Sequence, residues 1–258
     1  MTAAPDSFGQ FSLKGRTALV TGARRGIGAA IAAGYAAAGA ELILFARDAA
    51  LEDTLEAIKQ NGGGEATIVT ADFAEPDAVE AAATELVRTR QVDILVNNAG
   101  TIRRAPAAET STADWRHVID VNLNSTWAVT RPIGAAMAER GAGKIVTIAS
   151  LLSFQGGITV PAYTASKHAV AGLTRALANE WGAAGVQVNA IAPGYISTDN
   201  TTDLRADPER ETAIRSRIPA GRWGRPDDLV GAAVFLASSA ADYVNGHILA
   251  VDGGWLAR

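Results

Sequence analysis

Several residue types and patterns are scarce in this sequence, and each scarcity narrows what the protein can be. It has no cysteine, which excludes disulfides, thiolate zinc sites and thiol nucleophiles. No run of about 18 uncharged apolar residues occurs, so we expect no membrane-spanning helix. The N-terminal segment also lacks the continuous apolar stretch of a secretory signal peptide. We therefore expect a cytoplasmic protein that does not act at a membrane.

Charge is limited as well. Only 19% of the 258 residues are charged and the net charge is −4. The 23 lysines and arginines are scattered, and the only short clusters are Arg24 with Arg25 and Arg103 with Arg104. A nucleic-acid surface needs a basic patch or stripe. We therefore expect a small-molecule ligand, no nucleic-acid partner and no metal.

Short, mostly apolar runs alternate with longer, alanine-rich segments along the chain. Such runs are typical of strands buried on both faces of a parallel sheet. Strands are expected over residues 16–21, 41–45, 66–70, 93–97, 144–149, 186–191 and 247–251. Helices are expected over residues 27–38, 51–60, 76–89, 112–139, 163–183 and 226–236. The alternation predicts one α/β domain over residues 1–258, a doubly wound Rossmann-type fold with a seven-stranded parallel sheet flanked by helices.

One segment fits this alternation poorly. Residues 194–221 are polar, contain several Thr and Arg residues, and interrupt the last crossover between strands. A long excursion in a compact domain is often a lid or a binding loop. We predict that residues 194–221 form a lid over the substrate.

A glycine-rich turn, Thr-Gly-Ala-Arg-Arg-Gly-Ile-Gly, follows the first expected strand. Gly22 permits the tight turn, Gly26 allows backbone to approach a pyrophosphate, and Gly28 allows the next helix to pack on the sheet. The helix N-terminus offers free N–H groups and the positive end of its dipole to phosphates. The spacing differs from the G-x-G-x-x-G fingerprint, so a glycine-rich turn without a ligand is the alternative.

Two further segments indicate a nucleotide site. The run Asn-Asn-Ala-Gly, which includes Asn98, follows the fourth strand at the carboxyl edge, where such sheets bind ligands. Asp72, followed by Phe73, comes just after the third strand and has the chemistry to accept a hydrogen bond from an adenine amino group. A loop cap is an equally good interpretation of Asp72.

Tyr163 and Lys167 are four residues apart at the start of an expected helix, which places them on one face. A free tyrosine has a pKa of about 10, and a nearby ammonium favours the phenolate. We expect Lys167, aided by the charge of an oxidised nicotinamide, to bring the pKa of Tyr163 towards neutrality, so that Tyr163 can exchange a proton with a substrate oxygen held by Ser150. A surface Tyr–Lys pair is the better interpretation of such a spacing in isolation. Here the pair follows the glycine-rich turn and the Asn-Asn-Ala-Gly run, which favours catalysis.

These motifs, with Pro193-Gly194, resemble the short-chain dehydrogenase/reductase family from about Thr17 to the C-terminus. The resemblance implies hydride transfer between a nicotinamide and a carbonyl or secondary alcohol. It implies that Asn122 joins Ser150, Tyr163 and Lys167 in a catalytic tetrad and holds a water that connects Lys167 to solvent. It also implies a homotetramer formed through helices 112–139 and 163–183.

The cofactor preference depends on the end of the second strand. An acid there would bind the ribose 2′-hydroxyl of NAD, whereas an arginine would accommodate the 2′-phosphate of NADP. Ala46 occupies the acid position and Arg47 follows it, which with Arg25 favours NADP; Asp48, one residue beyond, leaves NAD open. The full predicted cofactor site is Gly22, Arg24, Arg25, Gly26, Ile27, Gly28, Arg47, Asp72, Phe73, Asn98, Ala99, Gly100, Tyr163, Lys167, Pro193, Gly194, Ile196 and Thr198.

Longer stretches resemble the sugar-acid dehydrogenases of this family, which implies a substrate with a carboxylate. Arginine can hold a carboxylate with two hydrogen bonds. Arg103 and Arg104 are the candidates, although a solvated basic pair is an equal alternative. The predicted substrate site is Arg103, Arg104, Ser150, Gln155 and Tyr163, and Arg205 and Arg217 are weaker candidates.

Two other functions remain as alternatives. A 3-oxoacyl reductase acting on an acyl carrier protein would need a basic docking patch, for which only Arg103, Arg104 and the 217–225 region are available. A dinucleotide-binding sensor would need no catalysis, and the complete Ser150, Tyr163 and Lys167 set argues against it.

Overall fold

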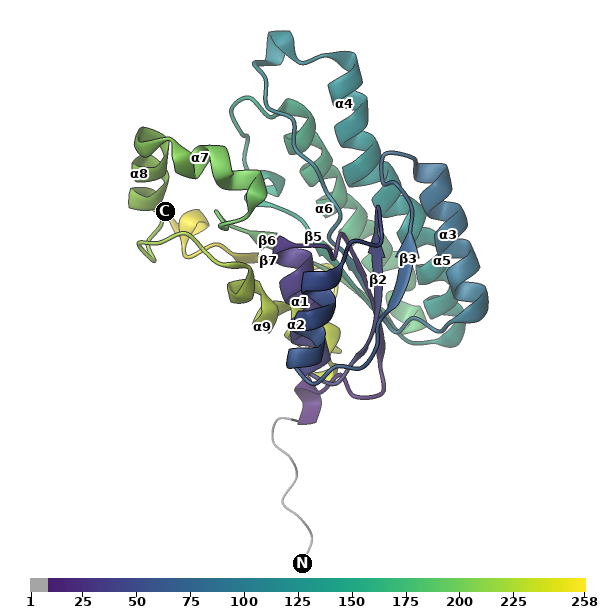
Figure 1. The fold of residues 1–258 in the computed structure, drawn as a ribbon. Helices are drawn as coiled ribbons and strands as arrows, with labels where there is room; N and C mark the ends of the chain where they lie inside the picture. Colours follow the sequence, from purple (N-terminus) through teal and green to yellow (C-terminus); the bar gives the residue numbers. More distant parts are fainter. Residues whose placement is uncertain (1–8) are drawn as a thin grey trace, which may run out of the picture.

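The computed structural model describes residues 9–258, and within them seven strands form one sheet (Figure 1). The strand order is β3-β2-β1-β4-β5-β6-β7 and every neighbouring pair is parallel. The strands are β1 (Thr17–Thr21), β2 (Glu41–Ala46), β3 (Thr67–Thr70), β4 (Ile94–Asn97), β5 (Gly143–Ile148), β6 (Val186–Pro193) and β7 (Ile248–Val251). The predicted doubly wound fold is confirmed; residues 1–8 of the predicted domain lie outside the described residues.

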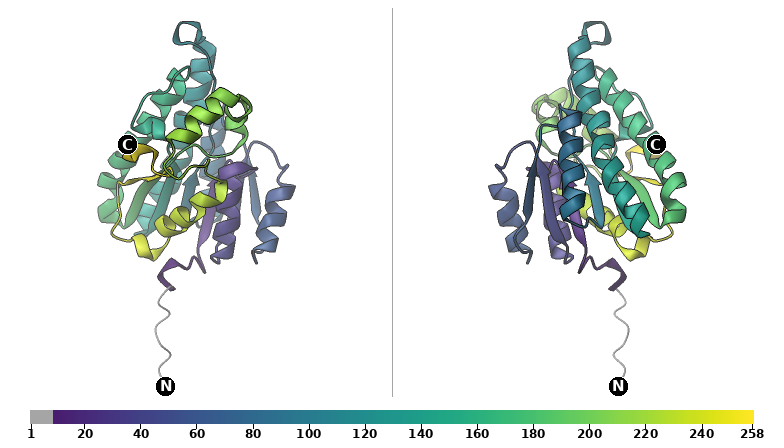
Figure 2. Two further views of the ribbon diagram at one scale, coloured as in Figure 1. Left: turned by 90° about the vertical axis from the view of Figure 1, so that its left-hand side faces the viewer. Right: turned by 90° about the vertical axis from the view of Figure 1, so that its right-hand side faces the viewer.

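Alternate side chains of the strands enter two hydrophobic layers. On β1, Ala18 and Val20 belong to one layer and Leu19 to the other. The first layer is covered by α1 (Gly26–Ala37), α2 (Glu52–Gln60) and α9 (Val230–Ala237), and the second by α3 (Pro76–Thr89), α5 (Ser125–Arg140) and α6 (Pro161–Trp181) (Figure 2). Coverage of both faces explains why the strands are apolar at successive positions. None of the helices within residues 9–258 is long and apolar enough to cross a membrane.

The helix expected over residues 112–139 is not continuous. It consists of α4 (Thr112–Ile119), a π-helical turn (Asp120–Asn124) and α5. The hydroxyl of Ser111 accepts a hydrogen bond from Asp114 N (3.0 Å) and so starts α4, as an N-cap should. A π turn adds a residue to a helix and is common at functional sites. This one contains Asn122, whose side chain is buried (1% exposed).

The segment predicted as a lid is largely helical. It contains α7 (Thr202–Ala206) and α8 (Pro208–Arg217), and both stand beyond the carboxyl ends of the strands (Figure 1). The Asp207 carboxylate begins α8 by accepting hydrogen bonds from Glu209 N (3.0 Å) and Arg210 N (3.1 Å). A polar sequence therefore forms exposed helices here rather than an irregular loop.

Candidate active site

A cavity of about 480 Å³ lies at the carboxyl ends of β1, β4, β5 and β6. The strand order reverses between β1 and β4, and open α/β sheets bind ligands at such a point. Most predicted site residues line the cavity: Gly22, Arg25, Gly26, Ile27, Asn98, Ala99, Gly100, Ser150, Tyr163, Lys167, Pro193, Gly194, Ile196 and Thr198. The prediction missed Ile148, Ala149, Ser197, Asp199, Asn200 and Thr201. The last four lie within residues 194–221, the segment predicted as a lid, and that prediction was the signal that could have found them.

The turn after β1 is packed directly against the loop after β4. Gly22 has a φ of 64°, and a Cβ there would lie 2.8 Å from the Cα of Ala99. The Asn98 amide donates to the carbonyl oxygens of Thr21 and Gly22 (both 3.0 Å), while the Thr21 hydroxyl accepts from Asn98 N (2.9 Å) and Ala99 N (3.0 Å). A Cβ at Gly28 would collide with the Gly22 carbonyl oxygen. Glycine is therefore required at both positions for this approach.

The N-terminus of α1 opens into the cavity. Arg25 is its N-cap residue and makes no side-chain cap bond, and Gly26 and Ile27 line the cavity. The first N–H groups of a helix lack partners within the helix. Because these donors face open space, the turn fits the pyrophosphate of a dinucleotide. A nicotinamide at the other end of the cavity would lie beside Tyr163, Lys167 and Ser150.

Tyr163 and Lys167 face the cavity from adjacent turns of α6. The ammonium of Lys167 lies 5.6 Å from the centre of the Tyr163 ring and donates to the Ile148 carbonyl oxygen (2.7 Å). Ser150 follows β5, and its hydroxyl accepts from Leu152 N (3.1 Å), which fixes the direction of the side chain. Parallel pairing therefore brings the end of β5 and the first turn of α6 to one proton-transfer site.

Burial controls the protonation of this pair. It raises the pKa of Tyr163, against the lowering effects of the Ser150 hydroxyl and the Arg104 charge. It lowers the pKa of Lys167 to about 8. For the groups of this chain alone, desolvation of the phenolate outweighs these effects, and the lowering expected from Lys167 together with an oxidised nicotinamide stays a prediction for the cofactor complex. Tyr163 is therefore a protonated donor at neutral pH.

Asn122 connects the loop after β4 to α6. Its amide oxygen accepts from Thr101 N (2.7 Å), and its amide nitrogen donates to Thr101 O and Ser166 Oγ (both 3.0 Å). Its backbone carbonyl accepts from the Thr126 hydroxyl (2.9 Å). These contacts fix the loop that carries Gly100 beside Lys167. The water-holding role implied by the family resemblance stays a prediction.

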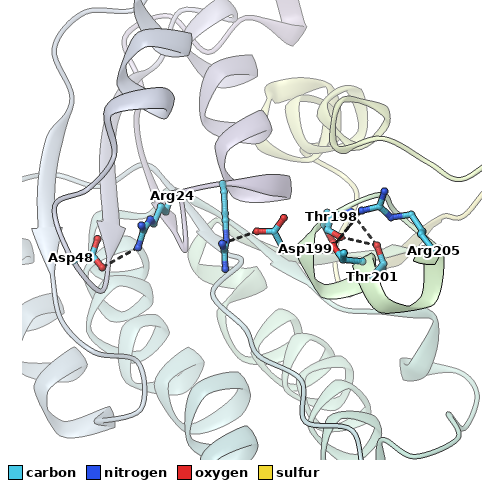
Figure 3. A network of polar contacts seen from close by, with 8 residues as sticks. Arg24, Asp48, Thr198, Asp199, Thr201 and Arg205 are labelled. Carbon is cyan, nitrogen blue, oxygen red and sulfur yellow. Dashed lines mark hydrogen bonds and ion pairs between the residues drawn. The ribbon is translucent and has the colours of Figure 1, made fainter. Parts of the chain in front are cut away.

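The arginines of the glycine-rich turn point in two directions. Arg24 Nη1 lies 3.2 Å from Asp48 Oδ2 (Figure 3). Arg47 Nε lies 3.7 Å from the same oxygen. Arg25 Nη1 instead lies 2.7 Å from Asp199 Oδ2, on the segment predicted as a lid. Arg24 is therefore the arginine of the turn that lies beside Asp48 and Arg47, whereas Arg25 contacts the segment predicted as a lid. That Arg25 and Arg47 both reach a 2′-phosphate stays a prediction.

Two predicted adenine contacts lie away from the cavity. The Asp72 carboxylate accepts from Ala74 N (2.9 Å), which is the loop-cap geometry. Phe73 is buried, with its ring centre 5.0 Å from that of Phe45. The structure supports the loop-cap interpretation of Asp72 and gives Phe73 a place in the core.

Only some of the predicted substrate residues lie at the cavity. Arg103 Nε lies 3.7 Å from Asp114 Oδ1, away from the cavity, and Gln155 does not line it either. Arg104 donates to the Asn200 carbonyl oxygen (3.0 Å), and its charge lowers the pKa of Tyr163. Arg104 does not line the cavity either, but its partner Asn200 does, so of the two adjacent arginines Arg104 is the one connected to the site.

The weaker candidates have structural partners. Arg205 donates to the Thr198 carbonyl oxygen (3.3 Å). The Arg217 guanidinium lies 4.0 Å from the centre of the Trp255 ring. The Trp255 ring in turn lies 4.7 Å from that of Tyr195, which follows the Pro193-Gly194 pair. These contacts attach the end of α8 to the C-terminal segment.

Comparison with known proteins agrees with this geometry. A family model described as enoyl-(acyl carrier protein) reductase matches residues 22–256. The chain is 59% identical over 248 residues to 2-dehydro-3-deoxy-D-gluconate 5-dehydrogenase of Bacillus subtilis (strain 168), covering 96% of this chain and 97% of that one. It is 44% identical to gluconate 5-dehydrogenase of Gluconobacter oxydans (strain 621H), covering 95% and 96%.

A solved structure of a gluconate 5-dehydrogenase from Burkholderia cenocepacia J2315, in complex with NADP and tartrate, is 40% identical with a TM-score of 0.92 and covers 97% of this chain and 99% of that one. The family model and these relatives extend over nearly all of the sequence. The chain belongs to the short-chain dehydrogenase/reductase family of NAD(P)-dependent oxidoreductases.

Proposed function

We propose that this protein interconverts a ketone and a secondary alcohol on a sugar acid, in the manner of its 2-dehydro-3-deoxy-D-gluconate 5-dehydrogenase relatives. The observation that carries the proposal is Arg104, a cation that donates to the cavity-lining Asn200 and whose charge lowers the pKa of Tyr163. A carboxylate at one end of the substrate would pair with Arg104 while the reacting carbon lies at Tyr163. Gluconate 5-dehydrogenase activity is the second candidate, since the Gluconobacter oxydans relative carries that name.

The protonation state of Tyr163 follows from the burial of the Tyr163–Lys167 pair. Tyr163 is protonated at neutral pH, so it can donate its proton to a ketone oxygen oriented by Ser150 during reduction. In the reverse direction the phenolate must form, and the Arg104 charge favours it. A bound nicotinamide would supply or accept the hydride. Asn122, Ser150, Tyr163 and Lys167 are thus the proposed catalytic set.

The surroundings of Tyr195 also support an anionic substrate. Burial raises the pKa of Tyr195, but the charges of Arg210, Arg217 and Arg104 lower it. These cations come from α8 and from the loop after β4, so positive charge surrounds Tyr195, which follows the cavity-lining Gly194. We therefore propose that residues 194–221 act as a lid that contributes positive charge around the sugar acid.

The cofactor is proposed to be NADP(H) in preference to NAD(H). Arg24 and Arg47 both lie at the end of β2, where a 2′-phosphate would lie. Asp48 partly neutralises them, so NAD(H) is expected to bind as well. Solved relatives from Beutenbergia cavernae and Agrobacterium tumefaciens contain bound NADP.

Reduction of an acyl-carrier substrate has less support. It would need free basic residues near the site, yet Arg222 forms a two-pronged ion pair with Asp228 (2.6 and 3.0 Å). Arg103 is near Asp114 and Arg217 stacks on Trp255. Arg103, Arg217 and Arg222, three of the basic residues expected to dock an acidic carrier, are therefore engaged within the chain.

A substrate panel tests the proposal. Oxidation of NADPH and reduction of NADP are measured with keto sugar acids, aldonic acids, the matching uncharged sugars and a 3-oxoacyl thioester. We expect Arg104→Gln to raise KM for the acids about 10- to 100-fold, the equivalent of a charge-assisted hydrogen bond, without changing turnover of uncharged sugars. Arg103→Gln is the matched control. Equal kcat/KM of the parent for acids and uncharged sugars would contradict the proposal.

We also propose a homotetramer, as the family resemblance implies. Trp115 on α4 and Trp127 on α5 are large aromatic residues with exposed fractions of 42% and 40%. They lie on the elements expected to pack across a two-fold axis, where Ala-rich α6 permits close approach.

A further inference from the structure

One ion pair connects two elements that face each other across the cavity. Arg25 Nη1 lies 2.7 Å from Asp199 Oδ2, and both residues line the cavity. Arg25 precedes α1, the proposed phosphate-binding helix. Asp199 is the first residue of the short helix Asp199–Thr201, directly before α7 and α8 (Figure 3). The pair therefore joins the phosphate-binding turn to the lid segment.

The lid side of this connection is held by a local network. The Thr201 hydroxyl accepts from Thr198 N (3.1 Å) and lies within donating distance of the carbonyl oxygens of Ile196 (2.8 Å) and Thr198 (2.9 Å). The Thr198 carbonyl also accepts from Arg205 on α7 (3.3 Å; Figure 3). Because these bonds fix the start of the lid, a restraint on Asp199 is passed on to α7.

We propose that Asp199 is a positioning residue: through its ion pair with Arg25 it holds the lid segment across the dinucleotide cavity and slows release of the cofactor. The inference rests on the proposed function, in which this cavity binds NADP(H). A dinucleotide whose pyrophosphate lies at the N-terminus of α1 would be enclosed between the sheet edge and this connection. Its exit then requires the ion pair to open.

The solvent exposure of the Arg25–Asp199 ion pair sets how strongly it can slow cofactor release. The side chains of Arg25 and Asp199 are 73% and 63% exposed, so the pair is a surface ion pair and is screened by salt. The loss of a surface ion pair of this kind should change the rate of cofactor release about two- to fivefold. We therefore expect modest acceleration of release, greatest at low ionic strength.

Stopped-flow fluorescence of NADPH release, with excess NADP as the displacing ligand, measures the effect. Asp199→Asn should accelerate NADPH dissociation about two- to fivefold at low salt and converge with the parent at high salt. Arg25→Gln should accelerate it also, and the double variant should be no faster than Arg25→Gln alone, because the two side chains act as one unit. Substrate KM should rise in Asp199→Asn while the single-turnover hydride-transfer rate stays within twofold of the parent.

Asp203→Asn is the matched control. Like Asp199→Asn, it removes one negative charge from the lid segment, here from α7. Asp203 forms no ion pair within residues 9–258. Its release rate should equal that of the parent. Unchanged or slower release in Asp199→Asn overturns the inference, and so do independent, multiplicative effects of the two substitutions. A parent protein that binds no dinucleotide overturns the proposed function itself.

Discussion

Tyr163 is half-buried and lines the cavity, where its hydroxyl can exchange a proton with the substrate, so turnover should depend on it. Tyr163→Phe removes the hydroxyl but keeps the ring, so the fold and NADPH binding should be unchanged. The proton path is lost, and kcat should fall at least 100-fold. Steady-state kinetics alongside an NADPH titration check both parts. Retention of more than a few per cent of parent activity would show that another group supplies the proton.

Lys167 carries a stability cost at neutral pH. Burial lowers its pKa from 10.5 to about 8, so the unfolded chain binds more protons than the folded one between these values. The parent should therefore become more stable as pH rises from 8 towards 10.5. Lys167→Met removes the buried charge and the hydrogen bond to Ile148, and we expect a net gain of roughly 1–3 kcal/mol in unfolding free energy at pH 7.

Urea unfolding of this variant and the parent, from pH 7 to pH 10, tests the sign. The advantage of Lys167→Met should shrink across that range, while its turnover is largely lost. A variant less stable than the parent at pH 7 would contradict the burial cost.

At the scale of elements, the turn between β1 and α1 depends on Gly22. Gly62 is a matched control, since its φ is 82° and a Cβ there meets nothing within 4 Å. Gly62→Ala should cost about 1–2 kcal/mol, from the left-handed backbone alone. Gly22→Ala adds a collision with the backbone of Ala99, and should cost about 1–3 kcal/mol more and abolish NADPH binding. Denaturation midpoints measure the loss of stability, and NADPH titration measures cofactor binding. Equal losses of stability in Gly22→Ala and Gly62→Ala would refute the prediction.

Cofactor preference belongs to the junction of β2 with the glycine-rich turn. Arg24→Gln or Arg47→Gln should each weaken NADPH binding about tenfold and change NADH binding less than twofold, because only the 2′-phosphate loses a charged partner. Asp48→Asn should tighten NADPH by freeing both arginines. Titrations of both cofactors measure these effects, and NADH acts as the internal control. A parent that binds NADH more than tenfold tighter than NADPH would contradict this preference.

For the whole molecule, light scattering at micromolar concentration should give a mass near four times the chain mass of 26.6 kDa. Trp127→Glu places a charge on the exposed face of α5 and should lower that mass. Ile68→Glu, at an exposed position of the edge strand β3, is the control and should leave it unchanged. A monomeric mass for the parent would rule out the proposed assembly.

Sequence alone was enough to determine the fold class and most of the cavity. Strands buried on both faces must be apolar at successive positions, so a parallel sheet can be recognised from the sequence. The glycine-rich turn and the Tyr163–Lys167 spacing are local features, set by backbone sterics and by the helical repeat. Chain order then placed both at the carboxyl edge of the sheet, where the structure has them.

Only the tertiary structure decided which arginine faces which acid, where the helix of residues 112–139 is interrupted, and in which direction the pKa of Tyr163 moves. The Arg25–Asp199 contact joins residues far apart in the chain, so no local pattern reports it. The pKa of Tyr163 is raised by desolvation, which is a property of the packed surroundings rather than of residue spacing. Local periodicity therefore determined the elements, while distances and solvent exclusion between elements determined the electrostatics of the site.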